Sequence, residues 1–209
     1  MYIDYNSKAG PWKLETQLYE GSNKLALICH PHPEFGGNMQ NNIVTSLFKG
    51  LKPDYTTMRF NFSGVGNSSG FHENSVGEVN QVSAVLDHAM DLGDWEEIHV
   101  IGYSFGAAVS APVALSSKHV RSFIAIAFPF DLFEDLSKKA VEEQEKHQKN
   151  VYLLIGDRDD FTSLDRFDSW KEKFGNNVKS DVIESNHFFW GKEREILSLI
   201  QDYVSGLAT

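Results

Sequence analysis

The sequence predicts an α/β fold with a mostly parallel central sheet and helices on both of its faces. The main observation is that short apolar runs alternate along the chain with stretches of helical period, as in strand–helix–strand units. Nearly every residue in most of these runs is apolar, so neither face of the strand suits contact with water. This is typical of parallel strands buried on both faces. Because 209 residues is the length of one domain, we expect residues 1–209 to form a single domain.

Six apolar runs are expected to be strands. They are LALIC (25–29), TTMRFNF (56–62), IHVIG (98–102), FIAIA (123–127), VYLLIG (151–156) and VKSDVI (178–183). Apolar side chains at helical spacing predict helices near residues 43–51, 79–90 and 196–204. Residues 12–18 instead alternate between apolar and polar side chains, so we expect an antiparallel edge strand near the N-terminus.

The charge of the chain argues against nucleic acid as a partner. Its 19 Lys and Arg against 29 Asp and Glu give a net charge of −10, and the basic residues form no cluster. No apolar run reaches the roughly 18 residues of a membrane span, and Asp4 stands where a secretory peptide would begin its apolar stretch. The single cysteine, Cys29, lies in an apolar run and is expected to be inert. We therefore expect a cytoplasmic protein with no membrane partner.

A G-x-S-x-G motif, GYSFG at 102–106, is the strongest local signal. It directly follows the run IHVIG and directly precedes the small-residue stretch AAVSAPVAL, so it lies at a strand-to-helix turn. Such a turn exposes the serine hydroxyl, and the glycines avoid collisions that larger side chains would cause. The helix N-terminus and the backbone N–H of Phe105 would face a developing oxyanion. Ser104 is therefore the candidate nucleophile, and a tight turn without chemistry is the alternative.

A nucleophilic serine needs a histidine base, and the base needs an orienting carboxylate. Three aspartates follow the run 151–156, namely Asp157, Asp159 and Asp160. His187 follows the last predicted strand, so acid and base lie at the same edge of the sheet as Ser104. His119 and His147 lie beside a strand start and in a charged stretch, where we expect surface positions. His187 is the candidate base, and the spacing leaves the acid open.

Four segments resemble those of a known superfamily. They are HPHPEFGGNMQNNIV (30–44), RFNFSGVGNSSG (59–70), GYSFGA (102–107) and the late pair GDRDD and NHFFWG. They resemble the α/β-hydrolase fold and, within it, small lidless bacterial hydrolases related to dienelactone hydrolases and short-chain esterases. In such proteins the acid is the Asp three places after the strand-ending Gly. The resemblance therefore implies a triad of Ser104, Asp159 and His187, with Asp160 as the second choice of acid.

The resemblance also implies how the oxyanion hole is completed. In the relatives, a His-Pro or His-Gly at the end of the first long strand opens the loop that supplies the second donor. This suggests the backbone N–H of His32, because Pro31 and Pro33 have none, and Glu34 is a weaker candidate. The relatives commonly have Arg after the NF of RFNF, where this chain has Ser63, so the position of that loop and the substrate preference stay open.

Two other motifs suggest a dinucleotide and a metal ion, but each departs from the pattern that such a ligand requires. The stretch GVGNSSG (64–70) is one residue too long for the dinucleotide fingerprint, and no strong helical period follows it. The pair His30-x-His32 is flanked by prolines and lacks the further ligands of a zinc cluster. We therefore expect no metal and no other cofactor.

The combined prediction is a serine hydrolase that works through an acyl-enzyme on a small ester-like molecule, with short-chain carboxylic esters as the first choice. Thioesters, lactones and peptides share this chemistry, and a hydrolase fold kept as a silent binding module is the alternative of another class. Residues 128–150 have room for little more than a crossover helix, so no large lid is expected. Two or three aromatic residues should face the open cleft, from the candidates Phe35, Tyr103, Phe128, Phe130, Phe161, Phe188 and Phe189.

Overall fold

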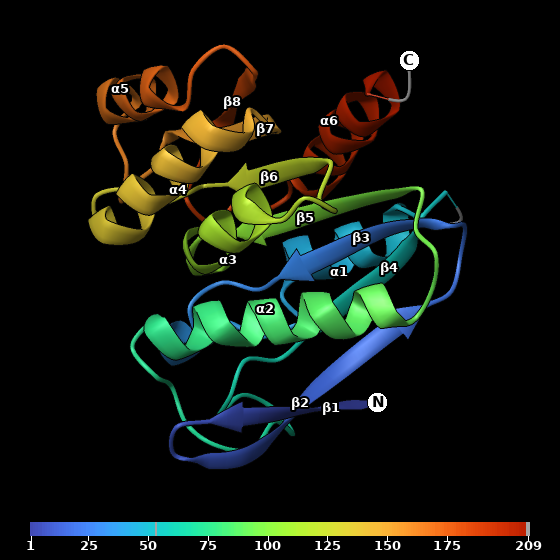
Figure 1. The fold of residues 1–209 in the computed structure, drawn as a ribbon. Helices are drawn as coiled ribbons and strands as arrows, with labels where there is room; N and C mark the ends of the chain where they lie inside the picture. The colour runs from blue at the N-terminus through green and yellow to red at the C-terminus, as the bar shows by residue number, and fades with distance from the viewer. Residues whose placement is uncertain (53, 208–209) are drawn as a thin grey trace.

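The computed structural model describes residues 1–52 and 54–207, and its centre is a β-sheet (Figure 1). Within that range the sheet has eight strands in the order β1-β2-β4-β3-β5-β6-β7-β8. The strands are β1 (Tyr2–Ser7), β2 (Gly10–Tyr19), β3 (Lys24–Cys29), β4 (Thr56–Phe60), β5 (Glu97–Tyr103), β6 (Ser122–Ile126), β7 (Asn150–Arg158) and β8 (Val178–Asn186). The pairs from β4 through β3 to β8 are parallel, and the β1–β2 and β2–β4 pairs are antiparallel. The prediction of a mostly parallel sheet is confirmed.

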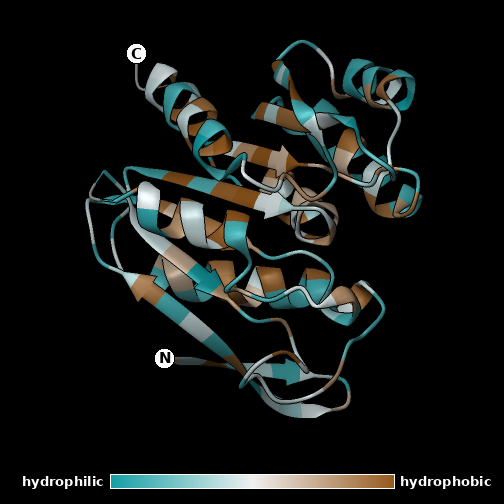
Figure 2. Ribbon diagram, turned by 180° about the vertical axis from the view of Figure 1, so that it is seen from behind, coloured by the Kyte–Doolittle hydropathy of each residue, from teal (hydrophilic) through white to brown (hydrophobic). Residues whose placement is uncertain are grey.

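Helices cover both faces of the sheet, as predicted. They are α1 (Asn42–Gly50), α2 (Val76–Asp91), α3 (Phe105–Ser116), α4 (Glu134–His147), α5 (Leu164–Phe174) and α6 (Glu193–Gly206), with a short 3₁₀ helix η1 (Pro33–Phe35). Figure 1 shows α2, α3 and α4 in front of the sheet, with α1 and α6 behind it. In Figure 2 most helices carry both brown and teal, because each buries an apolar side and leaves the other in water.

Two hydrophobic cores, one on each face, explain why the strands are so uniformly apolar. Along β3, Leu25, Leu27 and Cys29 pack into the core under α2 to α5, whereas Ala26 and Ile28 pack into the core under α1 and α6. The same alternation runs along β7. Successive side chains of a strand point to opposite faces, so a strand between two helical layers needs apolar residues at every position.

The N-terminal edge of the sheet differs from the expectation in one respect. β2 is antiparallel to its neighbours, as predicted, but it lies between β1 and β4, so the edge strand is β1. β1 has six residues, of which Ile3 and Tyr5 are buried. Two buried side chains are too few for a recognisable period, which is why this strand has no clear signal in the sequence.

The segment between β6 and β7 contains no large lid, which confirms the prediction. α4 occupies most of this segment and packs against α3.

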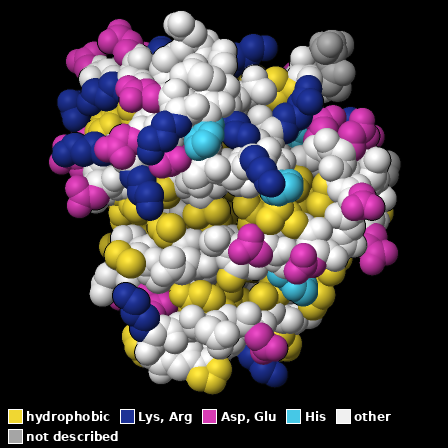
Figure 3. Space-filling view, in the orientation of Figure 1, with side chains coloured by type: hydrophobic (Ala, Val, Ile, Leu, Met, Phe, Trp, Pro, Cys, Tyr) yellow, Lys and Arg dark blue, Asp and Glu magenta, His cyan; other side chains and the backbone are white. Residues whose placement is uncertain are grey.

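Charged side chains of both signs are interleaved over α4 and α5 (Figure 3), and they include the pairs Lys138–Glu134 and Lys146–Glu143. Among the described residues, no helix combines the length and the apolar character that crossing a membrane requires.

Candidate active site

Ser104 lies in a sharp turn between β5 and α3. Its backbone has φ 55° and ψ −117°, a left-handed conformation that a non-glycine residue adopts only when the surrounding structure holds it there. The Ser104 N–H donates to the carbonyl of Ile126 at 2.8 Å, and the Ser104 carbonyl accepts from the amides of Ala107 at 2.9 Å and Ala108 at 3.2 Å. These bonds keep the hydroxyl at the tip of the turn, as expected for a nucleophile elbow.

The two glycines of the motif are required because α3 crosses the sheet closely. A Cβ at Gly102 would collide with the backbone of Ala107, and a Cβ at Gly106 would collide with the carbonyl of Cys29 on β3. The collisions are with backbone atoms, which cannot rotate away as a side chain can. The spacing G-x-S-x-G therefore follows from the packing of the first turn of α3 on β3 and β5.

Ser104, His187 and Asp159 form a continuous hydrogen-bonded chain. Nε2 of His187 lies 2.8 Å from Oγ of Ser104, and Nδ1 of His187 lies 2.8 Å from Oδ2 of Asp159. The side chains of His187 and Asp159 are only 5% and 1% exposed, so water competes little for these bonds. His187 and Asp159 follow the ends of β8 and β7, at the edge of the sheet that also holds Ser104. This geometry lets His187 accept a proton from the Ser104 hydroxyl.

The structure separates the three aspartates that follow the buried part of β7. Oδ1 of Asp159 accepts the amides of Phe161 at 2.9 Å and Thr162 at 3.1 Å, which leaves Oδ2 directed at His187. Asp157 instead accepts the amide of Ser185 on β8 at 2.8 Å, and Asp160 is exposed. Asp159 is thus the carboxylate that reaches the imidazole.

Tyr103 holds the loop that carries His187. Its hydroxyl donates to the carbonyl of His187 at 2.9 Å. Burial raises the pKa of Tyr103, and the charge of Asp159 adds to the effect, so the phenol stays protonated and able to donate. The sequence indicates Tyr103 only as a residue of the substrate pocket, because a contact across more than eighty residues has no local signal.

The two expected oxyanion donors lie close to Ser104, Phe105 as the next residue of the chain and His32 on the wall of the same cavity. Phe105 is the first residue of α3, so its amide has no acceptor within the helix. His32 lines the cavity together with Ser104, and its ring packs 4.7 Å from the ring of Phe105. Glu34, the weaker candidate, is ruled out as a free donor because its amide already donates to Nδ1 of His32 at 3.2 Å. Burial, with His72 nearby, lowers the pKa of His32.

His30 and Cys29 are buried, and their surroundings suit a structural role. Nε2 of His30 accepts the amide of Phe62 at 3.1 Å, and Nδ1 lies 2.6 Å from the carbonyl of Pro31, so both ring nitrogens are engaged. Burial lowers the pKa of His30 to about 4 and raises the pKa of Cys29 to about 12, so both groups are neutral at neutral pH. His30 therefore anchors the start of the loop that carries His32 and has no free nitrogen for a metal ion.

A cavity of about 420 Å³ opens beside Ser104 and His187. Four of the aromatic candidates line it, namely Phe35, Tyr103, Phe161 and Phe188. Phe161 lies against the base, with its ring 4.4 Å from the ring of His187, and Phe35 is 88% exposed at the rim. Gly36, Gly37 and Asn41 also line the cavity. The sequence predicts their loop only as the source of a backbone N–H for the oxyanion hole, not as part of the substrate pocket.

Three aromatic candidates do not face the cavity, so their assignment to the substrate pocket is wrong. Phe128 and Phe130 are buried in the core under α2 to α5, where their rings stack 4.2 Å apart. Phe189 is buried in the other core, under α1 and α6. The chain turns at Ala127, which has φ 49°, and this turn directs the residues after β6 into the core. Large apolar rings gain more from complete burial than from lining an open cleft.

Residues 27–202 match the family model of the alpha/beta hydrolase domain. This chain belongs to the alpha/beta hydrolase family. The alpha/beta hydrolase has a relative in Rickettsia prowazekii, an uncharacterized protein that is 31% identical over 193 residues, which are 86% of this chain and 78% of that protein. The resemblance to the α/β-hydrolase superfamily is confirmed.

Solved structures agree with this membership. An alpha-beta serine hydrolase homologue from Coxiella burnetii is 30% identical, with a TM-score of 0.79, and the match covers 95% of this chain and 94% of that one. A lidless serine hydrolase from Xanthomonas campestris is 25% identical, with a TM-score of 0.81 and coverage of 99% and 94%. This alpha/beta hydrolase is thus similar over nearly its whole length to serine hydrolases, one of which is described as lidless.

Proposed function

We propose that this alpha/beta hydrolase is a serine carboxylesterase that acts on small or short-chain esters through an acyl-enzyme. The observation that most supports the proposal is the unbroken chain from Ser104 through His187 to Asp159, with both contacts at 2.8 Å. The strained turn at Ser104 and the free helix N-terminus behind it add to this support.

In the proposed mechanism, Oγ of Ser104 attacks the ester carbonyl while Nε2 of His187 takes its proton. His187 then protonates the leaving alkoxide as the acyl-enzyme forms. In the second half His187 takes a proton from the attacking water and returns it to Oγ of Ser104, while the bond between Oγ and the acyl carbon breaks and the carboxylic acid is released. Asp159 accepts Nδ1–H of His187 and stabilises the imidazolium. The amides of Phe105 and His32 donate to the oxyanion in both halves.

The cavity supports the choice of a short acyl group. Its volume of about 420 Å³ and its aromatic lining suit a few methylenes, each of which contributes ~0.8 kcal/mol when buried. Among the described residues, α4 takes up most of the segment between β6 and β7, so we expect no tunnel that could enclose a long chain. A substrate with a long acyl chain would leave most of that chain in water.

Fluorophosphonate labelling together with a series of p-nitrophenyl esters of increasing acyl length tests the proposal. We expect the wild type to be labelled and to hydrolyse acetate and butyrate esters. Ser104→Ala should lose both properties, with kcat lower by several orders of magnitude. The matched control is Ser116→Ala, an exposed serine at the end of the same helix, which should behave as the wild type.

Four outcomes would contradict the proposal in different ways. Ester hydrolysis by Ser104→Ala at the wild-type rate would refute the nucleophile. A kcat/KM that keeps rising beyond about eight acyl carbons would refute the open cleft, because only an enclosed chain gains from further methylenes. Labelling without ester turnover would favour thioesters, lactones or peptides, and the absence of both would favour a silent binding module.

A further inference from the structure

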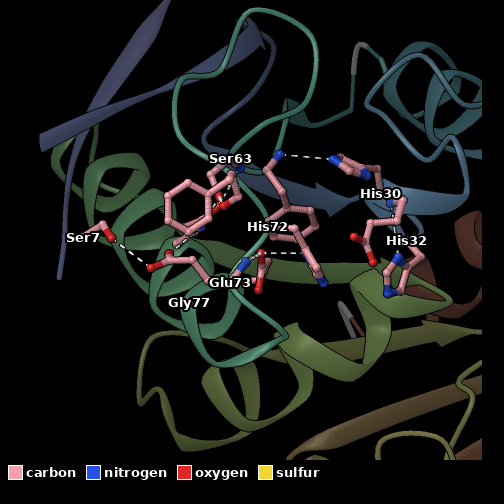
Figure 4. A network of polar contacts seen from close by, with 12 residues as sticks. Ser7, His30, His32, Ser63, His72, Glu73 and Gly77 are labelled. Carbon is pink, nitrogen blue, oxygen red and sulfur yellow. Dashed lines mark hydrogen bonds and ion pairs between the residues drawn. The ribbon is translucent and has the colours of Figure 1, made fainter. Parts of the chain in front are cut away.

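A second cluster of titratable side chains lies next to the active site. These side chains have no part in the proposed mechanism, which uses only the backbone amide of His32. It consists of His32 and Glu34, from the loop after β3, and His72, from the loop between β4 and α2. One ligand atom of each residue lies within 4.8 Å of the others. Figure 4 shows His72 and His32 reaching toward each other from their separate loops, and their ring centroids are 5.0 Å apart.

Two imidazoles and one carboxylate are a donor set that binds divalent transition-metal ions. Zinc sites with two histidines and one glutamate are a known class, in which three protein ligands leave a further position for water or another ligand. Glu34 is exposed, so its carboxylate can move to complete the site without disturbing the core. Nδ1 of His32 accepts the Glu34 amide at 3.2 Å, so an ion bound at Nδ1 would replace this one hydrogen bond.

A buried carboxylate next to His72 is the second observation that points to a cation. Glu78 on α2 is fully buried, and its Oε1 lies 2.9 Å from Nδ1 of His72 without forming a hydrogen bond. Its Oε2 has no hydrogen-bond partner among the described residues, whereas Oε1 accepts the amide of Glu73 at 2.8 Å. Burying a carboxylate with an unpartnered oxygen is costly, and a nearby positive charge offsets that cost.

Glu78 is close enough to His72 to orient it for ligation. Metal-bound histidines almost always donate their other ring N–H to a carboxylate, a carbonyl or water. Nδ1 of His72 lies 2.9 Å from Oε1 of Glu78 without forming a hydrogen bond, so a turn of the ring on binding an ion would align this N–H with Glu78. Nε2 of His72 is then left for an ion. Neighbouring Glu73 does not compete for His72, because its carboxylate accepts from Ser7 at 2.8 Å and from Gln81 at 3.2 Å (Figure 4).

We propose that His32, Glu34 and His72 bind one divalent transition-metal ion of the zinc class, with Glu78 as the positioning residue for His72. The ion cross-links the loop after β3 to the loop before α2. Because His32 and Phe35 line the cavity beside Ser104, the ion also fixes one wall of that cavity. The site differs from a His30–His32 pair, since both nitrogens of His30 are already engaged. It does not depend on the proposed esterase activity.

Calorimetric titration of chelator-treated protein with Zn²⁺ tests the site, and the visible absorption of bound Co²⁺ gives a second readout. We expect one equivalent of Zn²⁺ to bind the wild type. Glu34→Gln and His72→Gln should each weaken binding by about tenfold or more, and Glu78→Gln by about 10–100-fold, as for other residues that orient a metal ligand. Zn²⁺ should raise the Tm of the wild type but not that of His72→Gln.

Two control variants test whether histidines outside the cluster bind the ion. His119→Gln removes an exposed histidine far from the loops, and His187→Gln removes the imidazole of the triad; both should keep the single equivalent. Glu34 is exposed, so Glu34→Gln should fold normally, and an unchanged Tm in the presence of chelator verifies this. The proposal is overturned if the wild type binds no Zn²⁺, or if Glu34→Gln and His72→Gln bind it as tightly as the wild type does.

Discussion

In the described part of the protein, a serine, a histidine and a carboxylate form a hydrogen-bonded chain at two places. Besides the chain at Ser104, Oγ of Ser122 lies 2.6 Å from Nδ1 of His99, and Nε2 of His99 lies 3.2 Å from Oε2 of Glu97. These three residues are buried at the N-terminal ends of β5 and β6, whereas Ser104 follows the C-terminal end of β5. Ser122 begins a regular strand and does not precede a helix, unlike Ser104. The same residue types therefore serve stability in one place and fit nucleophilic catalysis in the other.

At the residue scale, the roles of neighbouring aspartates can be separated by mutation. Asp159→Asn should lower kcat for p-nitrophenyl acetate by about 10⁴-fold, because an amide at this position stabilises the wrong imidazole tautomer. Asp160→Asn changes an exposed neighbour and should leave kcat within about twofold of the wild type, as a surface substitution does. A larger loss in Asp160→Asn than in Asp159→Asn would show that the acid is assigned to the wrong residue.

At the scale of elements, the elbow depends on the close contact between α3 and β3. Gly106→Ala places a methyl group against the carbonyl of Cys29, so α3 must move away from the sheet. We expect the free energy of unfolding in urea to fall by about 1–3 kcal/mol, as for other overpacked sites. Ester hydrolysis should fall as well, since the same shift moves the amide of Phe105.

The matched control for this substitution is Gly93→Ala. A Cβ at Gly93 meets only the ring of Trp95 at 3.5 Å or more, which is an ordinary van der Waals contact. This variant should keep both the stability and the activity of the wild type. If Gly106→Ala unfolds at the same urea concentration as Gly93→Ala, the close approach of α3 to β3 is not what requires the glycine.

The elements also differ in how readily their sequences reveal them. α5 buries Phe167, Trp170 and Phe174, a helical spacing that is present in the sequence although our predicted helices did not include it. β1 is different, because its two buried residues are too few to predict a strand. They can be recognised as part of a strand only once β2 pairs with β1. The antiparallel hairpin gives β1 a hydrogen-bonded partner that its own short sequence does not specify.

At the scale of the whole molecule, buried His99 makes stability depend on pH. Burial lowers the pKa of His99 to about 4, although Glu97 acts in the opposite direction. Between about pH 6.5 and about pH 4 the unfolded chain therefore binds a proton at this residue that the native protein does not. The free energy of unfolding should fall as the pH decreases through this range, by about 3 kcal/mol from His99 at most.

Urea denaturation at several pH values between about 4 and about 7 measures this dependence. His99→Gln should be less stable than the wild type at neutral pH but should lose less stability on acidification. His119→Gln changes an exposed histidine and should keep the wild-type dependence on pH. An equal loss of stability on acidification in His99→Gln and the wild type would contradict the assignment to His99.

The sequence by itself determined the parallel sheet, the missing lid and the elbow at Ser104, because periodicity and glycine spacing depend on a few consecutive residues. Only the tertiary structure decided which aspartate meets His187, because a carboxylate is selected by where its oxygen points once β7 and β8 are paired. The division of the phenylalanines between core and cavity likewise depends on packing, since the same ring suits both. The meeting of His32 with His72 belongs with these cases, because two loops far apart in the chain converge only after the sheet between them has formed.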